Sequence, residues 1–593
     1  MGTRSDKICF FHTKGETFQS FLSPFYHVFL QVTCSSNQAT LLYTRYDQLI
    51  INTTALIKSG YTRSSLTCGY RYIQLVDADT YLFLPEQVIS GYKASLSSDY
   101  NGVWARCYLS HWWLLDWVLP GVALSFLGVQ VYHNILIYVP HKPSQPRLPD
   151  QYSVTLLVID ALSQLNFKRS FPATLSVLES VPGILYQGHH RVGQNSYPNV
   201  MALLSGETGG VWPEDIPNRV GMYYIDQERQ PLLSYVFRQH GYLTMQMEDV
   251  QNMGDFNRKG VVGFKQPPAD IYYRAAFWAI VKSNFALLRN RLIGSSDCYA
   301  CLQEKMQHKY QIPAIRDFIE TYKDSPTFSF IHLAEYLHND LNMAKHYDQD
   351  LADMIQTLQN SSALNNTFFL LMGDHGFQRS DPPFIFTKQG KTEMNMPAFY
   401  LLPPHDFSSR HPEKYSNLVH NSQLVTTFFD INQMLRDVLS LAAGQPAAHI
   451  FQGFEGHGQS LFSKLSNRTC EESEIPEEYC SCMEGVTSMD TEDDNLVRLA
   501  KALLTDVNNY LRNIQHCQQL SLNKLDNASI KKTDTQSHIS FLIYTTQRNA
   551  IFEAQVLCGD SCTINLTRLD WYSVTSQCLP HSLAHLAPLC ICP

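Results

Sequence analysis

The middle of the chain alternates between unbroken apolar runs and amphipathic stretches. Apolar runs occur at residues 152–159 ("YSVTLLVI"), 328–333 ("FSFIHL") and 367–372 ("TFFLLM"). Mainly apolar runs of this length are typical of strands buried on both faces. Helical spacing of apolar residues occurs between them, as at 172–181, 231–242 and 347–358. Strands that alternate with helices predict an α/β layer with a largely parallel central sheet.

The two flanks have a different pattern. Short Tyr-, Phe-, Val- and Thr-rich runs predict a β-rich N-terminal region, 1–140, and a proline-rich stretch from Pro140 follows as a linker. The apolar stretch from Trp112 is interrupted by polar residues and proline, which favours strands over a membrane span. Residues 465–593 contain many cysteines and a helical leucine pattern at 496–511, which predicts a Cys-rich C-terminal region. The central α/β domain is expected to comprise residues 141–464.

Composition limits the binding partners and the cellular compartment to be expected. The 593 residues carry a net charge of -9 and no long Lys/Arg run, so no nucleic-acid-binding footprint is expected. Fifteen cysteines favour disulfides formed in an oxidising compartment. N-glycans are expected at six Asn-X-Ser/Thr sequons, which begin at Asn52, Asn360, Asn365, Asn467, Asn527 and Asn565. These features predict an extracellular or secretory-pathway location, although the chain shows neither a classical signal peptide nor a membrane anchor.

Acidic and imidazole side chains follow the predicted strands. Asp160 ends the first apolar run, His338 and Asp340 follow the second, and Asp374–His375 follow the third. In open α/β sheets, ligands bind beyond the carboxyl ends of the strands. Carboxylates and imidazoles are also the ligand types that zinc accepts. For each residue alone, a helix cap or a solvated loop explains the pattern equally well, and this also holds for His457 in "FEGHGQSLF".

The stretch "GQNSYPNVMALLSGE", residues 193–207, adds a candidate nucleophile. Ser196 and Pro198 precede an apolar helical run, which predicts a hydroxyl at a helix N-terminus. Unsatisfied N–H groups and the helix dipole favour an anion there, and a metal would lower the pKa of the hydroxyl. The alternative is an ordinary helix-capping serine.

In this order the motifs resemble the alkaline phosphatase superfamily, and most closely its sulfatase-like DUF229 family. The resemblance rests on "LLVIDALSQLNFKRSFPATL", "GQNSYPNVMALLSG", "GYLTMQMEDV", "LLMGDHGFQ", "KQGKTEMNMPAFYLLPP" and "HGQSLFSKLSNRTCEESEIPEEYCSC". It implies an alkaline phosphatase/sulfatase-like sandwich that binds one or two divalent metal ions, expected to be zinc. It implies one metal held by Asp160, Asp374 and His375, with Ser196 as nucleophile and bridging ligand. His338 matches a ligand of the other metal, with Asp340 and His457 as additions.

Details of the motif separate the branches of the superfamily. Ser196-Tyr-Pro-Asn199 is similar to the Thr-Phe-Pro-Asn motif of the phosphodiesterases, in which the Asn contacts the phosphoryl oxygens. Sulfatases require Arg four residues after the nucleophile, and this chain has Val200. The phosphodiesterase branch has Asp four residues before the His of the second metal, where this chain has Ala334. Lys168 and Arg169 are further candidates for charge stabilisation, or else form a solvated helix face.

The sequence therefore predicts a metal-dependent hydrolase of phosphodiesters or phosphomonoesters that uses a serine nucleophile. The expected substrates are phosphate esters of small molecules, glycans or lipids. A non-catalytic extracellular binding protein on a hydrolase scaffold is the alternative, and a sulfatase is the third.

Overall fold

The computed structural model divides the chain into two compact units. One comprises Gly15–Gln378 and Glu393–Tyr479, and the other Met1–Lys14, Arg379–Thr392 and Cys480–Pro593. We call them the larger and the smaller unit. The residues described are 34, 38–77, 80–109, 129–208, 224–225, 232–250, 254–258, 261–282, 301–338, 340–378, 388–454, 456–481, 486–512, 514, 517–532, 537–559, 561–568, 576, 578–579, 586 and 589–593.

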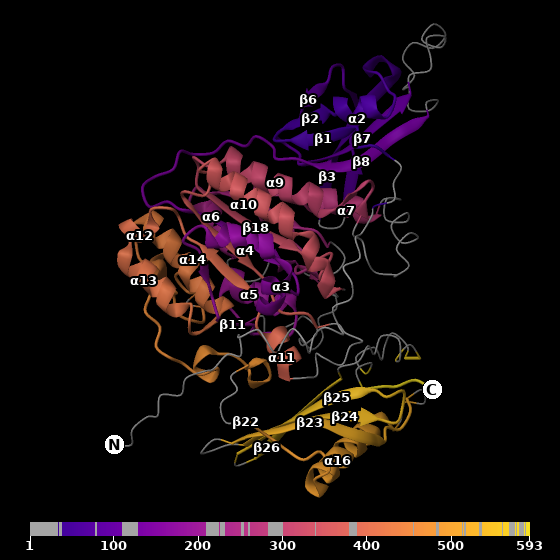
Figure 1. Ribbon diagram of the computed structural model, residues 1–593, viewed down its shortest axis with the longest axis vertical. Coiled ribbons are helices and arrows are strands. Elements are labelled where there is room, and N and C mark those ends of the chain that lie inside the picture. The colour runs from indigo at the N-terminus through magenta and orange to yellow at the C-terminus, as the bar shows by residue number, and fades with distance from the viewer. Residues whose placement is uncertain are drawn as a thin grey trace. The chain divides into compact units, whose positions relative to one another are not determined.

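A seven-stranded sheet forms the centre of the larger unit (Figure 1). Its order is β10 (Ile184–Leu185), β20 (Phe399–Leu402), β19 (Thr367–Met372), β9 (Ser153–Ile159), β18 (Thr327–Leu333), β12 (Leu243–Glu248) and β15 (Ile271–Tyr272). The five strands from β19 to β15 are parallel, while β20 runs antiparallel to both of its neighbours. The predicted α/β fold with a largely parallel sheet is confirmed.

Each face of this sheet is covered by its own hydrophobic core and set of helices. Leu157 and Ile159 of β9 belong to the first core, whereas Val154, Leu156 and Val158 belong to the second, because strand side chains alternate between faces. The first core contains residues of α3 (Gln164–Ser170), α4 (Pro172–Glu179), α7 (Arg274–Lys282), α9 (His308–Thr321) and α10 (Asp348–Asn360). The second contains residues of α5 (Ser196–Ser205), α6 (Leu233–Gln239), α12 (Phe407–Arg410), α13 (Pro412–Asn421) and α14 (Phe428–Ala443). This is a helix–sheet–helix sandwich.

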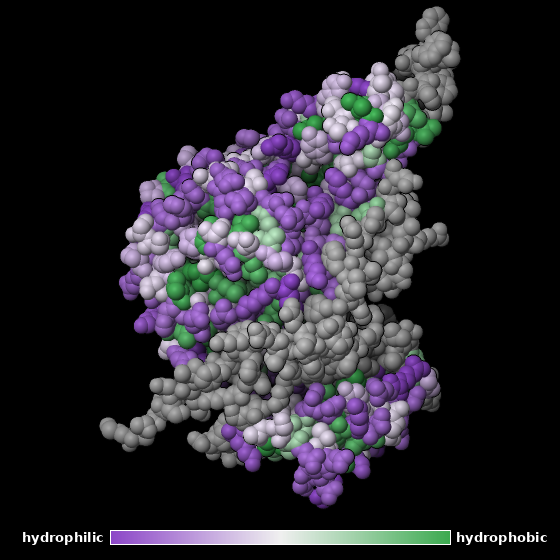
Figure 2. Space-filling model, viewed as in Figure 1, coloured by the Kyte–Doolittle hydropathy of each residue, from purple (hydrophilic) through white to green (hydrophobic). Residues whose placement is uncertain are grey.

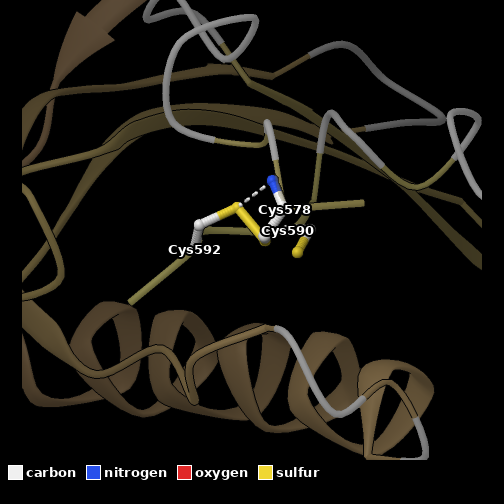
Figure 3. Close-up of side chains that lie close together, drawn as sticks. All are labelled: Cys578, Cys590 and Cys592. Carbon is white, nitrogen blue, oxygen red and sulfur yellow. Dashed lines mark hydrogen bonds between the residues drawn. A yellow bond between two sulfur atoms is a disulfide. The ribbon is translucent and has the colours of Figure 1, made fainter. Parts of the chain in front are cut away.

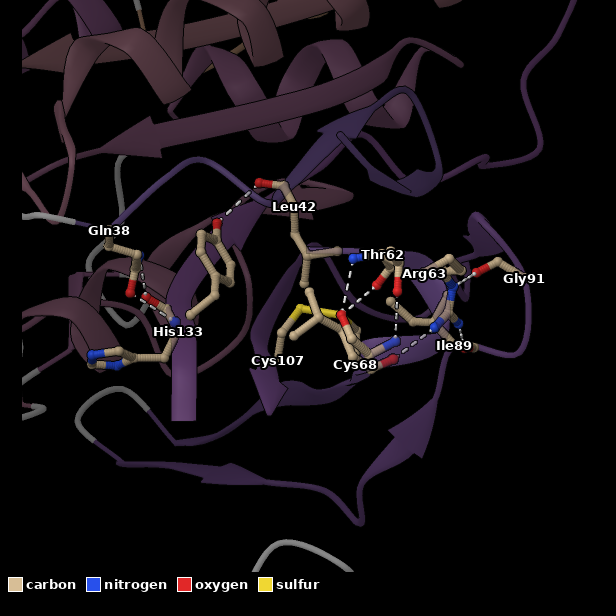
Figure 4. The surroundings of a disulfide bond; sticks show 12 residues. Gln38, Leu42, Thr62, Arg63, Cys68, Ile89, Gly91, Cys107 and His133 are labelled. Carbon is tan, nitrogen blue, oxygen red and sulfur yellow. Dashed lines mark hydrogen bonds between the residues drawn. A yellow bond between two sulfur atoms is a disulfide. The ribbon is translucent and has the colours of Figure 1, made fainter. Parts of the chain in front are cut away.

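The N-terminal part of the larger unit is β-rich, as predicted. It contains a sheet with the order β4 (Thr80–Phe83), β3 (Leu66–Asp77), β7 (Gly102–Leu109) and β8 (Gln130–Ile137), and a small sheet of β1 (Leu42–Arg45), β2 (Gln48–Ile51) and β6 (Lys93–Ser95). Cys68 and Cys107 face each other across β3 and β7 and form a buried disulfide (Figure 4). Nearby, the guanidinium of Arg63 donates to the carbonyls of Ile89 and Gly91.

The smaller unit contains a five-stranded antiparallel sheet that the sequence did not reveal. Its strands are β22 (Val486–Ser488), β23 (Leu522–Lys532), β24 (Ser537–Thr545), β25 (Ile551–Cys558) and β26 (Cys562–Arg568). The predicted leucine-rich helix is α16 (Asp494–Leu511), which shares a core with this sheet (Figure 1). Cys578, Cys590 and Cys592 lie together in this unit (Figure 3), but their sulfurs belong to disulfides Cys578–Cys592 and Cys517–Cys590. They are therefore structural bridges.

Disulfides, helix hydropathy and the surface bear on the compartment that the sequence predicts. Five disulfides joining described cysteines support folding in an oxidising environment. Among the described residues, no helix is both long and apolar enough to span a membrane. Of the apolar stretch from Trp112, residues 130–137 form strand β8 as predicted, and residues 112–128 lie outside the described part. On the face shown in Figure 2, the described surface is mostly hydrophilic, with small patches of apolar side chains between the polar ones.

Candidate metal and nucleophile site

Two neighbouring parallel strands place three metal-ligating side chains together. Asp160 follows β9, and Asp374 and His375 follow β19, which pairs directly with β9. One ligand atom of each of the three residues lies within 4.8 Å of the others, and all three side chains are buried. Asp160 comes two residues after Val158 of the second core, so the alternation of the strand directs it toward the face on which α5 packs. The sequence predicted this convergence from the strand ends.

The turns that carry the two aspartates are tightly interlocked. Ala161 has a φ of 57°, a left-handed conformation that non-glycine residues rarely adopt, and its N–H donates to Asp374 Oδ1 at 2.9 Å. A Cβ at Gly373 would lie 2.1 Å from the carbonyl oxygen of Leu162, so only glycine fits there. The close approach fixes Asp374 against the loop that follows β9.

His375 presents one ring nitrogen to the cluster. Its Nδ1 donates to the carbonyl oxygen of Gly376 at 2.8 Å, because a carbonyl can only accept. Its Nε2 therefore carries the lone pair when the ring is neutral, and it lies 3.4 Å from Asp374 Oδ2 and 3.8 Å from Asp160 Oδ1. A backbone acceptor on the other nitrogen is the usual arrangement around a metal-ligating histidine.

Ser196 lies close to the same nitrogen of His375. It is the first residue of α5, whose buried residues Val200, Met201 and Leu204 anchor the helix in the second core. Ser196 is half-buried, and its Oγ lies 3.4 Å from His375 Nε2. A hydroxyl at this position meets the N-terminal end of the helix dipole, which favours negative charge. The structure thus brings the predicted nucleophile to the predicted ligands.

Asn199 is held by the loop that precedes Ser196. Its Oδ1 accepts from the N–H groups of Val192 and Gly193, both at 2.9 Å. Its Nδ2 donates to the carbonyls of Gly193 and Asn195, both at 3.0 Å. These four bonds use the full capacity of the amide. In this structure the side chain therefore fastens the loop, and it has no hydrogen-bonding capacity left for a phosphoryl oxygen.

Burial and mutual repulsion shift the ionisation of the cluster. Burial, together with the charge of Asp374, raises the pKa of Asp160 well above its ordinary value. Burial acts in the same direction on Asp374, but His375 and His332 outweigh it and lower the pKa of that carboxyl. Burial lowers the pKa of His375, which favours the neutral imidazole that can bind a metal.

The donor set fits a divalent cation. Asp160 Oδ1 and Asp374 Oδ2 are buried atoms without a hydrogen-bond partner among the described residues. Leaving a carboxylate oxygen both buried and unpaired is costly, and a cation removes that cost. Two carboxylates, an imidazole and a hydroxyl are nitrogen and oxygen donors of the kind that zinc accepts. A metal therefore accounts for the unpaired oxygens.

The other sequence-predicted residues lie apart from this group. His338 is half-buried in the turn five residues after β18, outside the three-residue group. Asp340 is exposed and caps the 3₁₀ helix Leu341–His346 through the N–H of Asn342. The N–H of His457 donates to the carbonyl of Gly206, just past the C-terminal end of α5. Ser196 begins that ten-residue helix, whose length is about 15 Å at 1.5 Å per residue.

The two basic candidates on α3 have partners of their own. Arg169 makes two bonds to the carboxylate of Glu393, at 2.7 and 2.8 Å, and Ser163 donates to the same carboxylate. Lys168 Nζ donates to Gln187 Oε1 at 3.3 Å. Neither contact reaches the metal-ligating group directly.

Sequence reasoning missed a second set of buried polar groups beside the site. His332 lies within β18, Glu248 ends β12 directly opposite it, and Asp255 follows shortly after. Burial and the neighbouring Asp255 raise the pKa of Glu248 to about 8. The signal was present in "LTMQMED" and "FSFIHL", in which acids end one buried run and a histidine interrupts another.

Comparison with protein families agrees with the sequence resemblance. A family model described as "Protein of unknown function (DUF229)" matches residues 34–526. A search of curated proteins found no match. Similar solved structures include the phosphonate monoester hydrolase SpPMH from Silicibacter pomeroyi, with 11% identity, a TM-score of 0.36 and coverage of 67% of this chain and 89% of that one. The zinc complex of the C-terminal periplasmic domain of EcEptC from Escherichia coli has 12% identity, a TM-score of 0.33 and coverage of 50% and 86%. The lipoteichoic acid synthase LtaP from Listeria monocytogenes has 15% identity, a TM-score of 0.34 and coverage of 56% and 83%.

Proposed function

This chain belongs to the DUF229 family, and from its site we propose that it is a metal-dependent phosphate ester hydrolase with Ser196 as nucleophile. One observation carries the proposal. The buried oxygens of Asp160 and Asp374, which have no hydrogen-bond partner among the described residues, lie close to His375 Nε2, whose one hydrogen-bond contact among those residues is the Ser196 hydroxyl. A helix cap or a solvated loop would account for each residue singly, but not for their convergence.

Asp160, Asp374 and His375 would hold the metal ion, with the Ser196 hydroxyl as the fourth donor. When bound, a zinc ion would supply Lewis-acid polarisation of the phosphoryl oxygen and would lower the pKa of the hydroxyl. The sequence resemblance also implies a second metal at His338, and we keep that site as a proposal.

The chain's own residues would orient the reaction. Ser196 Oγ loses its proton to solvent and forms a bond to phosphorus while the bond to the ester oxygen breaks, and the departing alkoxide takes up a proton from solvent and leaves as the alcohol. Water then attacks the phosphoserine and regenerates the hydroxyl, releasing phosphate or a phosphomonoester. Backbone N–H groups at the start of α5 would stabilise the negative charge on the phosphoryl oxygens. Asn199 would act as a positioning residue, because its amide holds the loop 192–195.

Phosphate is favoured over sulfate because the chain has Val200 where the sulfatase motif has Arg. Substrates would be phosphate esters of small molecules, glycans or lipids. The disulfides support an extracellular or secretory-lumen location for the enzyme. N-glycosylation is part of the proposal, since five of the six sequon asparagines are exposed, namely Asn360, Asn365, Asn467, Asn527 and Asn565.

The test is hydrolysis of bis-p-nitrophenyl phosphate, p-nitrophenyl phosphate and p-nitrophenyl sulfate, each with added zinc or with chelator. Ser196→Ala should abolish zinc-dependent phosphate ester hydrolysis and leave the fold intact. Ser205→Ala is the matched control, since Ser205 ends the same helix and its buried hydroxyl donates to the carbonyl of Met201. It should retain activity.

Other outcomes separate the alternatives. Full activity in Ser196→Ala would overturn the nucleophile assignment. Hydrolysis of the sulfate ester alone would favour a sulfatase, and mass spectrometry should then find formylglycine at Ser196. A folded protein with no activity on any ester and no bound metal would favour a binding protein on a hydrolase scaffold.

A further inference from the structure

A buried histidine outside the predicted site is aimed at the metal-ligating group. His332 lies in β18, and its side chain is 2% exposed. Its Nδ1 lies 2.6 Å from Asp255 Oδ2 and donates to it, because a carboxylate accepts. Its Nε2 is buried, has no hydrogen-bond partner among the described residues, and lies 3.9 Å from Asp374 Oδ2. That oxygen is one of the two unpaired oxygens of the site.

The carboxylate that orients His332 is itself fixed. The N–H of Asp255 donates to Glu248 Oε1, and Glu248 lies opposite His332 in the pairing of β12 with β18. A Cβ at Gly254 would lie 2.0 Å from Glu248 Oε1, so the turn that carries Asp255 closes tightly over this carboxylate. Glu248, Asp255 and His332 thus form a buried chain that ends at the unpaired Nε2.

An ordinary structural histidine in the same protein has a different pattern. His308 is also fully buried and paired with an aspartate, but both of its ring nitrogens are hydrogen-bonded. Its Nε2 lies 2.8 Å from Asp350 Oδ2, and its Nδ1 lies 3.1 Å from the hydroxyl of Tyr336. The unpaired nitrogen of His332 would be a cost to the fold unless something binds it.

We propose that His332 is a further metal ligand of this site and that Asp255 orients it. A carboxylate on one ring nitrogen with the other nitrogen facing the ion is the usual arrangement of a metal-ligating histidine. Asp374 Oδ2 lies 3.4 Å from His375 Nε2 and 3.9 Å from His332 Nε2, so a cation bound at this oxygen would have both imidazole nitrogens nearby. The site then spans the ends of β19, β9 and β18, with Asp160, which follows β9, in the middle.

This inference rests on the proposed metal-dependent function, and its test uses metal binding as the readout. Zinc affinity by competition with a chelating dye, and the visible absorption of the cobalt-substituted protein, are measured for the full chain and three variants. Asp255→Asn should weaken binding about 10- to 100-fold, the usual effect of removing a partner of a metal-ligating histidine. His332→Gln should weaken it at least as much and change the cobalt spectrum. His308→Gln, the matched control, should leave both readouts unchanged.

The outcomes distinguish the two proposals. If the wild-type chain binds neither zinc nor cobalt, the proposed function fails. If it binds them and His332→Gln has the same affinity and cobalt spectrum, only the role of His332 fails. Should the variants not fold, X-ray absorption of wild-type protein loaded with one equivalent of zinc decides. Scattering from two or more imidazoles supports His332 as a ligand, and scattering from only one overturns it.

Discussion

The two aspartates of the site should oppose folding without a metal and favour it with one. Asp160 and Asp374 are buried, and their ligating oxygens lie within 4.8 Å. Two full negative charges at that distance repel by about 3.5 kcal/mol at an effective dielectric constant of 20. Asp160→Asn removes one charge and keeps the shape. Because neighbouring imidazoles and protonation already relieve part of the repulsion, we expect the metal-free variant to be about 1–3 kcal/mol more stable than the metal-free wild type.

Metal should reverse this order. At a free zinc concentration about one thousand times its dissociation constant, wild-type protein gains about 4.1 kcal/mol of unfolding free energy, which exceeds the advantage expected for the metal-free variant. Asp160→Asn lacks one ligand, so at the same zinc concentration its gain should be much smaller. The substitution is therefore predicted to stabilise the protein in chelator and to destabilise it, relative to wild type, in zinc.

Differential scanning calorimetry in EDTA and in zinc measures the stability of wild type and variant without and with the metal. The chain has two units and need not unfold in one step, so the transition that responds to zinc in wild-type protein is the one to follow. Asp430→Asn is the contrasting control, since Asp430 is fully buried but ion-paired with Arg468. Its loss should cost about 3–5 kcal/mol in both conditions. If Asp160→Asn were destabilising in EDTA and still gained the full zinc increment, the reasoning about the cluster would be refuted.

Three further predictions concern other parts of the larger unit. Burial lowers the pKa of His189 to about 3 and that of His190 to about 4. Below about pH 6.5 the unfolded chain therefore binds more protons than the folded chain, and the unfolding free energy decreases as the pH falls. At pH 5 the two together should cost about 4 kcal/mol relative to pH 7, and His189→Asn should halve this loss in urea titrations. Replacing Cys68 and Cys107 together by Ala should lower the unfolding free energy by about 4 kcal/mol, as expected for a loop of this length, and a reductant should then have no further effect at this bridge. Asn199→Leu should lower kcat about 100-fold by releasing the loop before the nucleophile, with zinc affinity unchanged, and unchanged kcat would contradict the positioning role.

The sequence predicted those residues of the site that directly follow the ends of strands. Asp160 and the Asp374–His375 pair come directly after long apolar runs, and parallel strands bring such ends to one edge of the sheet. Ser196 was recognisable because a proline and an apolar helical run follow it. These signals are local, and only the right-handed, parallel winding of the chain is needed to combine them.

Non-local pairing explains what could not be predicted. His332 resembles a core residue of a buried strand, and only the register of β18 against β12 places it beside Glu248. The path of the loop that brings Asp255 to His332 has no local signal. The C-terminal sheet was missed for a similar reason, because its antiparallel strands depend on partners rather than on unbroken apolar runs.

The way the chain alternates between its two units limits how it can be divided for expression. The first segment of the larger unit ends at Gln378, three residues after His375. Arg379–Thr392 then belongs to the smaller unit, and the second segment of the larger unit begins at Glu393. Within the smaller unit, the ammonium group of Lys391 pairs with the carboxylate of Glu553. A fragment truncated after Tyr479 would keep Arg379–Thr392 but lose the strands of the smaller unit. Lys391 would then lack the carboxylate of Glu553 as its counter-ion. Recombinant versions of the larger unit should therefore retain the C-terminal sheet, or replace Arg379–Thr392 with a short linker.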